Sequence, residues 1–399
     1  MRDLFGRVST SGLALVLISS AFIDLELALD LGPWHANAPI ADIAALAILP
    51  LGAWTIFRRR GVPMPILPWA ALCVVALLSL VNAANPMQGA HFVLRKIAFP
   101  GVAFGLGVAG LVSGRVPPRT TRALLLAGLG LTAAVSLGTS LGRLLAGNGL
   151  WWSRIAGLTP NHKTLAVALA GALPLALGIA TVPEGRDRAA ARAISALSLV
   201  AIALSMSKAA WIGAAVGVAW FVPRHRPLAS RPMLLVPALA VGLAALTALP
   251  LISGSRPMLD AARSRHSLNK RAWRLFSAHP FLGAGAGTSV VVEAVTFPDY
   301  RVNGVDAHGV VQKIGGELGI LGLGTWLWFT GSAGLALWRR REPKGAGIAW
   351  GCAGTFATLH VELLLSTEAL SSTHWAPLAV AWGLAHAERR APQPTEGPR

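Results

Sequence analysis

The sequence predicts an all-α polytopic membrane protein, one integral membrane domain spanning residues 1–399 with about twelve transmembrane helices. Hydrophobic residues make up 54% of the chain and charged residues only 13%, whereas a soluble domain carries about 25% charged residues. The mean hydropathy is +0.58. Apolar stretches of about 20 residues, long enough to cross the hydrocarbon core, recur from end to end. This composition excludes intrinsic disorder, a coiled coil and a disulfide-stapled secreted scaffold.

Ten spans are clear as apolar segments: 8–30, 40–57, 66–82, 91–112, 121–146, 160–182, 233–252, 310–338, 346–366 and 373–387. The first span follows Arg2 and Arg7, as the apolar region of a signal peptide follows its basic N-terminal residues. Asp24 and Glu26 interrupt it and further spans come after it. We therefore expect residues 8–30 to be an uncleaved first helix.

The stretch 193–222 is too long for one crossing. As a single helix it would extend for about 44 Å, against a hydrocarbon core of roughly 30 Å. Its middle reads Ser205-Met206-Ser207-Lys208. The sequence therefore predicts two short helices, 193–206 and 209–222, which turn at Ser207-Lys208 and bring the total to twelve crossings.

The distribution of positive charge supports this count. With both termini in the cytoplasm, every predicted cytoplasmic segment contains at least two Arg or Lys residues, as the positive-inside rule requires. A single crossing over 193–222 would place some of these clusters outside. The formal charge of +18 is thus typical of a membrane protein, and nucleic-acid binding is not expected.

The remaining cations fall at outer helix ends or in outer loops, above all in a long outer segment at 253–309, between spans nine and ten. They are Arg95, Lys96, Arg143, Arg154, Lys163, Lys208, Arg256, Arg263, Arg265, Lys270, Arg271, Arg274, Arg301 and Lys313. Topology permits these charges but does not require them. The simplest reason for them is an anionic ligand; a solvated helix face or contact with lipid headgroups is the alternative.

Lys208 is the most informative of these cations. The 16 residues of helix from Arg192 to Lys208 rise only about 24 Å, less than the hydrocarbon thickness. An ionisable group at that depth is costly and usually faces a wet cavity or a partner. We expect Lys208 to face a functional cavity, with a snorkelling lysine as the alternative.

Within the outer segment, Arg263–His279 reads as an amphipathic helix that Pro280 ends. Glycines at 283, 285 and 287 follow, and they predict a tight turn with close backbone approach rather than a phosphate-cradling loop. His308 lies where the chain re-enters the membrane. Its imidazole could accept a proton from a hydroxyl, although a lone histidine at an interface is more often structural or faces lipid headgroups.

Four groups of residues follow one another along the chain: Arg154-x-x-Gly157-x-x-Pro160-Asn161, then Ser205-x-Ser207-Lys208, then Ser264-Arg265 with His279-Pro280-x-x-Gly283-x-Gly285, and finally His308 with Glu317-x-Gly319-x-x-Gly322. In this order they resemble the O-antigen ligase and polymerase superfamily. The likeness covers about residues 150–340, and the twelve-span layout with a large periplasmic loop before the tenth span extends it to the whole chain.

The resemblance implies a GT-C-like glycosyltransferase of the bacterial inner membrane that uses no metal and no cofactor. It implies transfer of a glycan from an undecaprenyl-pyrophosphate carrier on the periplasmic side. His308 matches the family's histidine at the loop end, the proposed base on the acceptor hydroxyl. Arg265, Lys208 and Arg154 match positions that stabilise negative charge on the departing pyrophosphate.

Supporting roles follow for Asn161, Arg271 and Glu317, of which Glu317 is expected to orient its helix or another polar group. The sequence departs from the family pattern in three places. Lys208 replaces the usual arginine and keeps the charge without the bidentate fork. Gly309 follows His308 where asparagine is common, and Asn269 stands where an aromatic residue is expected.

Three functions remain open at this point. The first is an O-antigen ligase, with lipid A–core as the acceptor and membrane lipids as surroundings. The second is a polymerase of the same superfamily, whose acceptor is another carrier-linked glycan. The third is a transporter or flippase, which would be expected to show inverted repeats and ionisable groups near the midplane; the sequence shows no such repeat.

Overall fold

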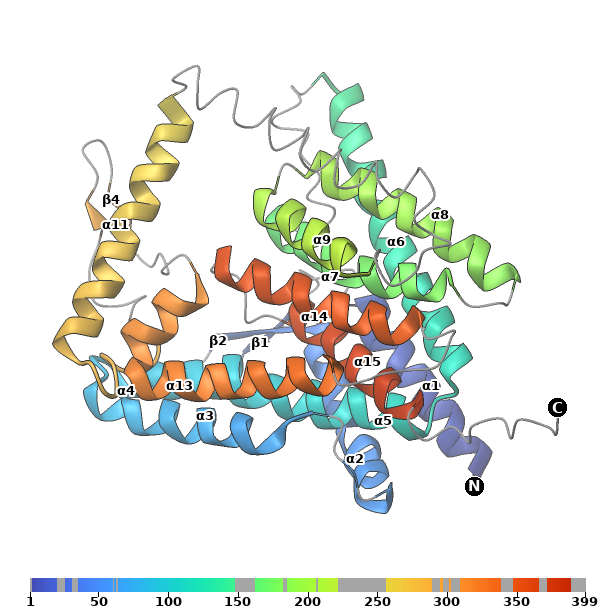
Figure 1. Cartoon of the computed structure of the whole chain (residues 1–399), viewed down its shortest axis with the longest axis horizontal. Helices are drawn as coiled ribbons and strands as arrows, with labels where there is room; N and C mark the ends of the chain where they lie inside the picture. The colour runs from blue at the N-terminus through green and yellow to red at the C-terminus, as the bar shows by residue number, and fades with distance from the viewer. Residues whose placement is uncertain are drawn as a thin grey trace.

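The computed structural model describes residues 2–19, 26–30, 35–59, 61, 64–147, 162–181, 185–205, 207–221, 256–288, 295–296, 301–302, 309–338, 347–365 and 372–388. This part of the chain is almost entirely helical (Figure 1). Its elements are α1 (Arg2–Ser19), α2 (Ile40–Arg59), α3 (Ile66–Leu78), η1 (Ser79–Asn82), α4 (Pro86–Phe92), η2 (Val93–Ala98), η3 (Gly101–Val108), α5 (Ala109–Gly114), α6 (Pro118–Leu145), α7 (His162–Ile179), α8 (Gly185–Leu204), α9 (Lys208–Phe221), α11 (Arg256–Ala278), α13 (Val310–Trp338), α14 (Gly347–Leu365) and α15 (Ser372–Glu388).

Among the described residues, five helices are long and apolar enough to cross a membrane: Ile40–Arg58, Pro86–Gly114, Pro118–Arg143, Val310–Leu337 and Gly347–Leu365. Three shorter apolar helices, Gly6–Ile18, Ile66–Asn82 and Leu165–Ile179, accompany them. The chain is therefore a multi-pass membrane protein. Helices are found in the other predicted spans, of which the first is only partly helical, and the span predicted at 233–252 lies outside the described residues.

The predicted first helix at 8–30 is wrong at its C-terminal end. Helix α1 ends at Ser19, and β1 (Glu26–Asp30) pairs antiparallel with β2 (His35–Pro39). Gly32-Pro33 lies between the two strands in the sequence, and this dipeptide is a strong turn signal. A second short hairpin, β3 (Val295–Thr296) with β4 (Arg301–Val302), lies within the predicted outer segment, which is therefore not wholly helical.

The predicted division of 193–222 into two helices is confirmed. Helix α8 ends at Leu204 and α9 begins at Lys208. Two serine hydroxyls form hydrogen bonds with backbone groups at the break. Ser205 Oγ donates to the Ile202 carbonyl at 2.6 Å, and Ser207 Oγ accepts from the Ala210 N–H at 3.5 Å. The indole of Trp211 donates to the same Ile202 carbonyl at 2.7 Å and so ties the start of α9 to the end of α8.

Close contacts through small residues hold α7, α9 and α14 together. A Cβ added at Gly213 of α9 would lie 2.8 Å from Cγ of Glu362 in α14, and one at Gly351 of α14 would lie 2.6 Å from the Pro174 carbonyl of α7. Small residues at such interfaces let helices approach closely in a membrane, where dispersion contacts replace the hydrophobic effect.

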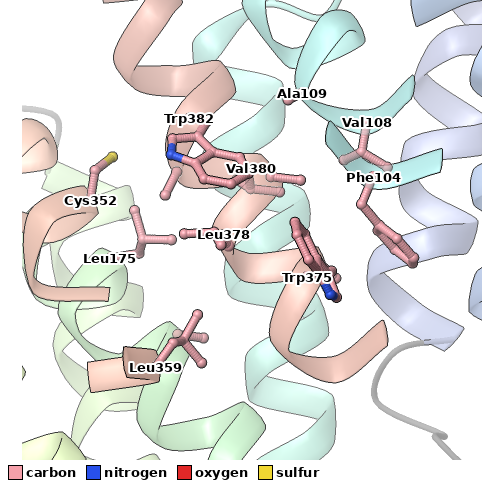
Figure 2. Packing of buried hydrophobic residues seen from close by; sticks show 14 of the residues in the cluster. Phe104, Val108, Ala109, Leu175, Cys352, Leu359, Trp375, Leu378, Val380 and Trp382 are labelled. Carbon is pink, nitrogen blue, oxygen red and sulfur yellow. The ribbon is translucent and has the colours of Figure 1, made fainter. Parts of the chain in front are cut away.

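Helix α15 supplies the centre of the apolar core. Figure 2 shows Trp375, Leu378 and Trp382 of α15 between two groups of side chains. One group comes from the segment of η3 and α5 (Phe104, Val108 and Ala109), and the other comes from α7 and α14 (Leu175, Cys352 and Leu359). Cys352 is fully buried and Cys73 is half-buried. Helices from both halves of the chain therefore share one core.

Candidate functional site

The amphipathic helix predicted at 263–279 is confirmed as α11, which begins earlier, at Arg256. Leu268 and Ala272 are buried, whereas Lys270, Trp273 and Arg274 are exposed. The buried side rests on α13, where a Cβ added at Gly316 would lie 3.2 Å from the Ala272 carbonyl oxygen. Helix α11 runs crosswise to α13 (Figure 1), so it covers one end of that helix.

Helix α13 is not one continuous helix, as the span predicted at 310–338 implied. Gly319 has φ 66° and ψ −161°, far outside the helical region, and the chain turns there. Residues 310–318 form a short first half, and residues 320–338 form a longer second half that runs in a different direction (Figure 1). Only glycine adopts this backbone conformation readily.

The loop at 280–287 lies against this break. Its backbone forms hydrogen bonds with the N–H and carbonyl groups that the break leaves without helical partners. The N–H groups of Ala284 and Gly285 donate to the carbonyls of Gly316 and Glu317, at 2.9 and 3.0 Å. On the other side of Gly319, the N–H groups of Ile320 and Leu321 donate to the carbonyls of Pro280 and Phe281, at 2.8 and 3.3 Å. We call these four hydrogen bonds the loop–helix interlock.

Glycines in the loop make the interlock possible. Gly283, Gly285 and Gly287 all have positive φ, between 71° and 99°. A Cβ at Gly283 would overlap the backbone of Glu317, and a Cβ at Gly285 would overlap Ala83. The predicted tight turn with close backbone approach is thus confirmed.

The opposite side of the loop is held by the segment η1. The Asn82 side chain donates through Nδ2 to the Gly283 carbonyl at 2.9 Å, and the Ala286 N–H donates to Ser79 Oγ at 3.1 Å. Ser79 is fully buried. The glycine loop is therefore fixed between η1 and the broken helix α13.

Glu317 adds a side-chain contact to the interlock. The residue is buried, and its Oε2 accepts the Gly287 N–H at 3.1 Å. Glu317 therefore binds the backbone of the glycine loop, and its role in the site stays a prediction.

A narrow pocket lined mostly by aromatic and aliphatic side chains lies beside the interlock; we call it the aromatic cavity. Its walls come from α3, α4, η2, both halves of α13, and α15. The lining residues are Trp69, Leu72, Phe92, Lys96, Ile97, Lys313, Ile314, Glu317, Leu318, Trp326, Phe329 and Trp375. The broken helix α13 thus contributes to this cavity from both of its halves.

Two lysines line this cavity together with Glu317. Lys313 is 6% exposed, and its Nζ lies 4.5 Å from the centre of the Phe92 ring, in cation–π contact. Lys96 comes from η2. Two ammonium groups and one carboxylate give these three side chains a formal charge of +1.

The structure describes three of the seven residues predicted for the site as complete residues: Lys208, Arg271 and Glu317. Lys208 is half-buried at the start of α9, one turn before Ile212, which is 45% exposed. Arg271 is half-buried on α11, next to Ala272 in the contact with α13. Arg265 lies on α11, with only its backbone described.

The other three predicted residues, Arg154, Asn161 and His308, lie outside the described residues. Gly309, which follows His308, is described: its φ is 99°, and its carbonyl accepts the Lys313 N–H at 3.1 Å. A Cβ at Gly309 would lie 2.8 Å from the Leu364 carbonyl oxygen, at the end of α14. The first half of α13 therefore starts two residues after His308 and packs against α14.

Sequence reasoning placed Lys96 and Lys313 among the outer cations but did not assign them to the site. The available signal was a lysine inside or at the edge of an apolar span. The sequence does not show that η2 and the first half of α13 line one cavity, which is where the structure brings the two lysines together. In the part of the chain that the structure describes, no group of three or more His, Cys, Asp or Glu residues could hold a metal ion.

Comparison with known families agrees with the geometry. The sequence model of the O-antigen ligase family matches residues 193–327. This range contains α9, α11, the glycine loop and the break in α13, so both partners of the interlock lie inside the match. A search of curated proteins found no match. The resemblance to the O-antigen ligase superfamily is thus confirmed for this region of the chain.

Proposed function

We propose, from the match of residues 193–327 to the O-antigen ligase family model, that the protein is an O-antigen ligase of the bacterial inner membrane. It transfers a glycan from undecaprenyl pyrophosphate to a terminal sugar of lipid A–core at the periplasmic face. One observation carries the proposal: the interlock joins the motif His279-Pro280-x-x-Gly283-x-Gly285 to the motif Glu317-x-Gly319-x-x-Gly322 in space.

The interlock matters because it connects the two segments that carry the central predicted residues. Arg265 lies on α11, whose C-terminal end leads directly into the glycine loop. His308 precedes the first half of α13, whose C-terminal end receives that loop. A rigid junction of this kind limits how far the two segments can move relative to each other, as catalysis by positioning requires.

In the proposed mechanism, His308 accepts the proton of the acceptor hydroxyl as that oxygen attacks the anomeric carbon of the donor sugar. The bond from that carbon to the pyrophosphate breaks, and the glycan is transferred with inversion. Arg265, Lys208 and Arg154 stabilise the negative charge that grows on the departing pyrophosphate, without a metal ion. Asn161 and Arg271 support these groups, and Glu317 holds the loop.

A polymerase of the same superfamily is the second candidate function, because the same motifs serve a carrier-linked glycan as acceptor. A flippase is a remote alternative. The proposed topology places both termini in the cytoplasm and residues 253–309 in the periplasm, between spans nine and ten of a single membrane domain.

In vitro transfer with the purified full-length protein tests the proposal. A labelled glycan on undecaprenyl pyrophosphate is offered with lipid A–core, and separately with a second carrier-linked glycan. A ligase labels lipid A–core and a polymerase lengthens the carrier-linked glycan. Absence of both products, with donor and acceptors intact, would exclude transferase activity.

A further inference from the structure

We infer that the exposed face of α11 binds the anionic phospholipid headgroups of the periplasmic leaflet of the membrane. This face, which we call the α11 outer face, consists of Lys270, Trp273 and Arg274, and Phe281 follows it in the glycine loop. The inference rests on the proposed topology, which places α11 in the periplasm. It adds a lipid partner to the helix that carries Arg265.

The direction of α11 lays this face along the membrane boundary. Helix α11 runs crosswise to α13 (Figure 1), and the second half of α13 belongs to a helix long and apolar enough to cross the membrane. A helix that lies crosswise to a membrane span runs close to the membrane plane. The 23 residues of α11 extend for about 35 Å in that direction.

The glycine loop joins the α11 outer face to the lipid-facing surface of α13. Ile320 and Leu321 begin the second half of α13, and both side chains are exposed. Their N–H groups bind the carbonyls of Pro280 and Phe281, and Phe281 itself is 71% exposed. Large apolar side chains that are exposed together on a membrane protein mark a surface in contact with lipid. The C-terminal end of α11 therefore lies at the level of the lipid headgroups.

The charge of α11 favours an anionic surface as the partner. Residues 261–292 contain five Arg or Lys residues and no Asp or Glu. Lys270 and Arg274 are both exposed. They stand four residues apart, so their side chains are neighbours on the helix surface, and like charges at this spacing destabilise a helix. A lipid phosphate between them removes the repulsion and forms charge-assisted hydrogen bonds with both.

Trp273 supplies the apolar part of the contact. Its side chain is 66% exposed and stacks on Phe276, with ring centroids 5.5 Å apart. Tryptophan is enriched at membrane–water interfaces, because its ring is apolar and its N–H is polar. An exposed indole beside two cations matches the headgroup region of an anionic bilayer, whereas water alone offers no partner to the ring.

Hydrogen exchange of the full-length protein in nanodiscs tests the inference. Exchange of the amides at 266–278 is followed in phosphatidylcholine nanodiscs that contain increasing fractions of phosphatidylglycerol. We expect phosphatidylglycerol to slow this exchange in wild type, and high salt to reduce the effect. Lys270→Gln and Arg274→Gln should each raise the phosphatidylglycerol fraction that gives half of the slowing about fivefold, the effect of losing one cation near an anionic surface.

Three further variants separate the lipid contact from the fold of α11. Lys270→Arg keeps the charge and should respond to phosphatidylglycerol as wild type does. Arg119→Gln removes an exposed cation of α6 and should leave the response of α11 unchanged. Trp273→Ala should speed exchange of α11 in every lipid mixture. Exchange in wild type that does not depend on phosphatidylglycerol, or an unchanged response in the double variant K270Q/R274Q, would overturn the inference.

A phosphorylated lipid A–core shares the chemistry of the headgroups, so it is added to phosphatidylcholine nanodiscs as a separate arm. Slower exchange of α11 with lipid A–core and not with phosphatidylglycerol would assign the α11 outer face to the acceptor and overturn the inference.

These outcomes are distinct from those of the proposed function, because none of them requires turnover. A protein that shows the phosphatidylglycerol effect but transfers no glycan would retain this surface and lose the ligase assignment. A protein that transfers glycan while α11 does not respond to phosphatidylglycerol would retain the assignment and lose this surface.

Discussion

The backbone N–H of Gly287 donates a 3.1 Å hydrogen bond to Oε2 of Glu317, across 30 residues of sequence. Both residues are buried, and Glu317 also accepts the Gly285 N–H through its backbone carbonyl. One residue of α13 thus binds the glycine loop through its backbone and its side chain. The loop and the helix break are therefore expected to form and unfold together.

Gly319→Ala should destabilise the protein strongly. The position requires φ 66°, and a Cβ there would overlap the Phe281 carbonyl. This conformation is open essentially to glycine alone and costs another residue about 1–3 kcal/mol, and the overlap adds to this. Gly324→Ala, on the same helix with open space around it, is the matched control and should leave the unfolding temperature in detergent unchanged or slightly higher. Equal melting of the two variants would contradict the interlock.

Glu317→Ala and Glu317→Gln should differ in their effect on the loop. Alanine leaves the buried Gly287 N–H without its acceptor, which costs about 1–3 kcal/mol, whereas glutamine can still accept that hydrogen bond. Hydrogen exchange of the amides at 283–288 measures the difference. We expect faster exchange in Glu317→Ala and near-native exchange in Glu317→Gln. Similar exchange in both variants would show that the contact contributes nothing to the loop.

The sequence allowed most helices to be placed because hydrophobic periodicity and length are local properties. The break at Ser205–Ser207 was predictable, because a single helix over the 30 residues 193–222 would be much longer than the hydrocarbon core is thick. The strand pair β1–β2 was missed because Asp24 and Glu26 were treated as interruptions of a helix, although Gly32-Pro33 is a turn signal in the sequence.

The arrangement of residues inside the candidate site could not be predicted, because it depends on tertiary contacts that no local sequence pattern encodes. Gly319 reads as one more glycine in an apolar span, and its role follows only from the carbonyls of Pro280 and Phe281 that meet the chain there. Lys96 and Lys313 are more than 200 residues apart, so their shared cavity follows from tertiary packing alone.

Cysteine labelling tests the predicted topology. In a background where Cys73 and Cys352 are replaced by alanine, Lys270→Cys should react in intact cells with a maleimide that cannot cross the inner membrane, because Lys270 is exposed on the proposed periplasmic helix α11. Arg119→Cys, exposed at the start of α6, should react only after lysis. The reverse pattern would invert the proposed orientation.

Lys208→Ala should raise the KM for the donor by about tenfold or more, because one charge-assisted contact to the pyrophosphate is lost. Lys208→Arg should retain most of the activity, since the position needs a positive charge at the start of α9. The readout is initial transfer rate against donor concentration at saturating acceptor. Equal loss of activity in both variants would mean that the charge at Lys208 is not what the donor binds.

His308→Ala should abolish glycan transfer while the protein still folds and inserts. The acceptor hydroxyl must lose its proton as it attacks, and a positioned base contributes about 10²–10⁴-fold to such a step. The variant is compared with wild type for initial transfer rate, detergent-extracted yield and unfolding temperature. His91→Ala removes an exposed imidazole of α4 and should transfer at the wild-type rate. Full activity in His308→Ala would remove the base from the mechanism, whereas loss of activity together with loss of folding would show a structural role.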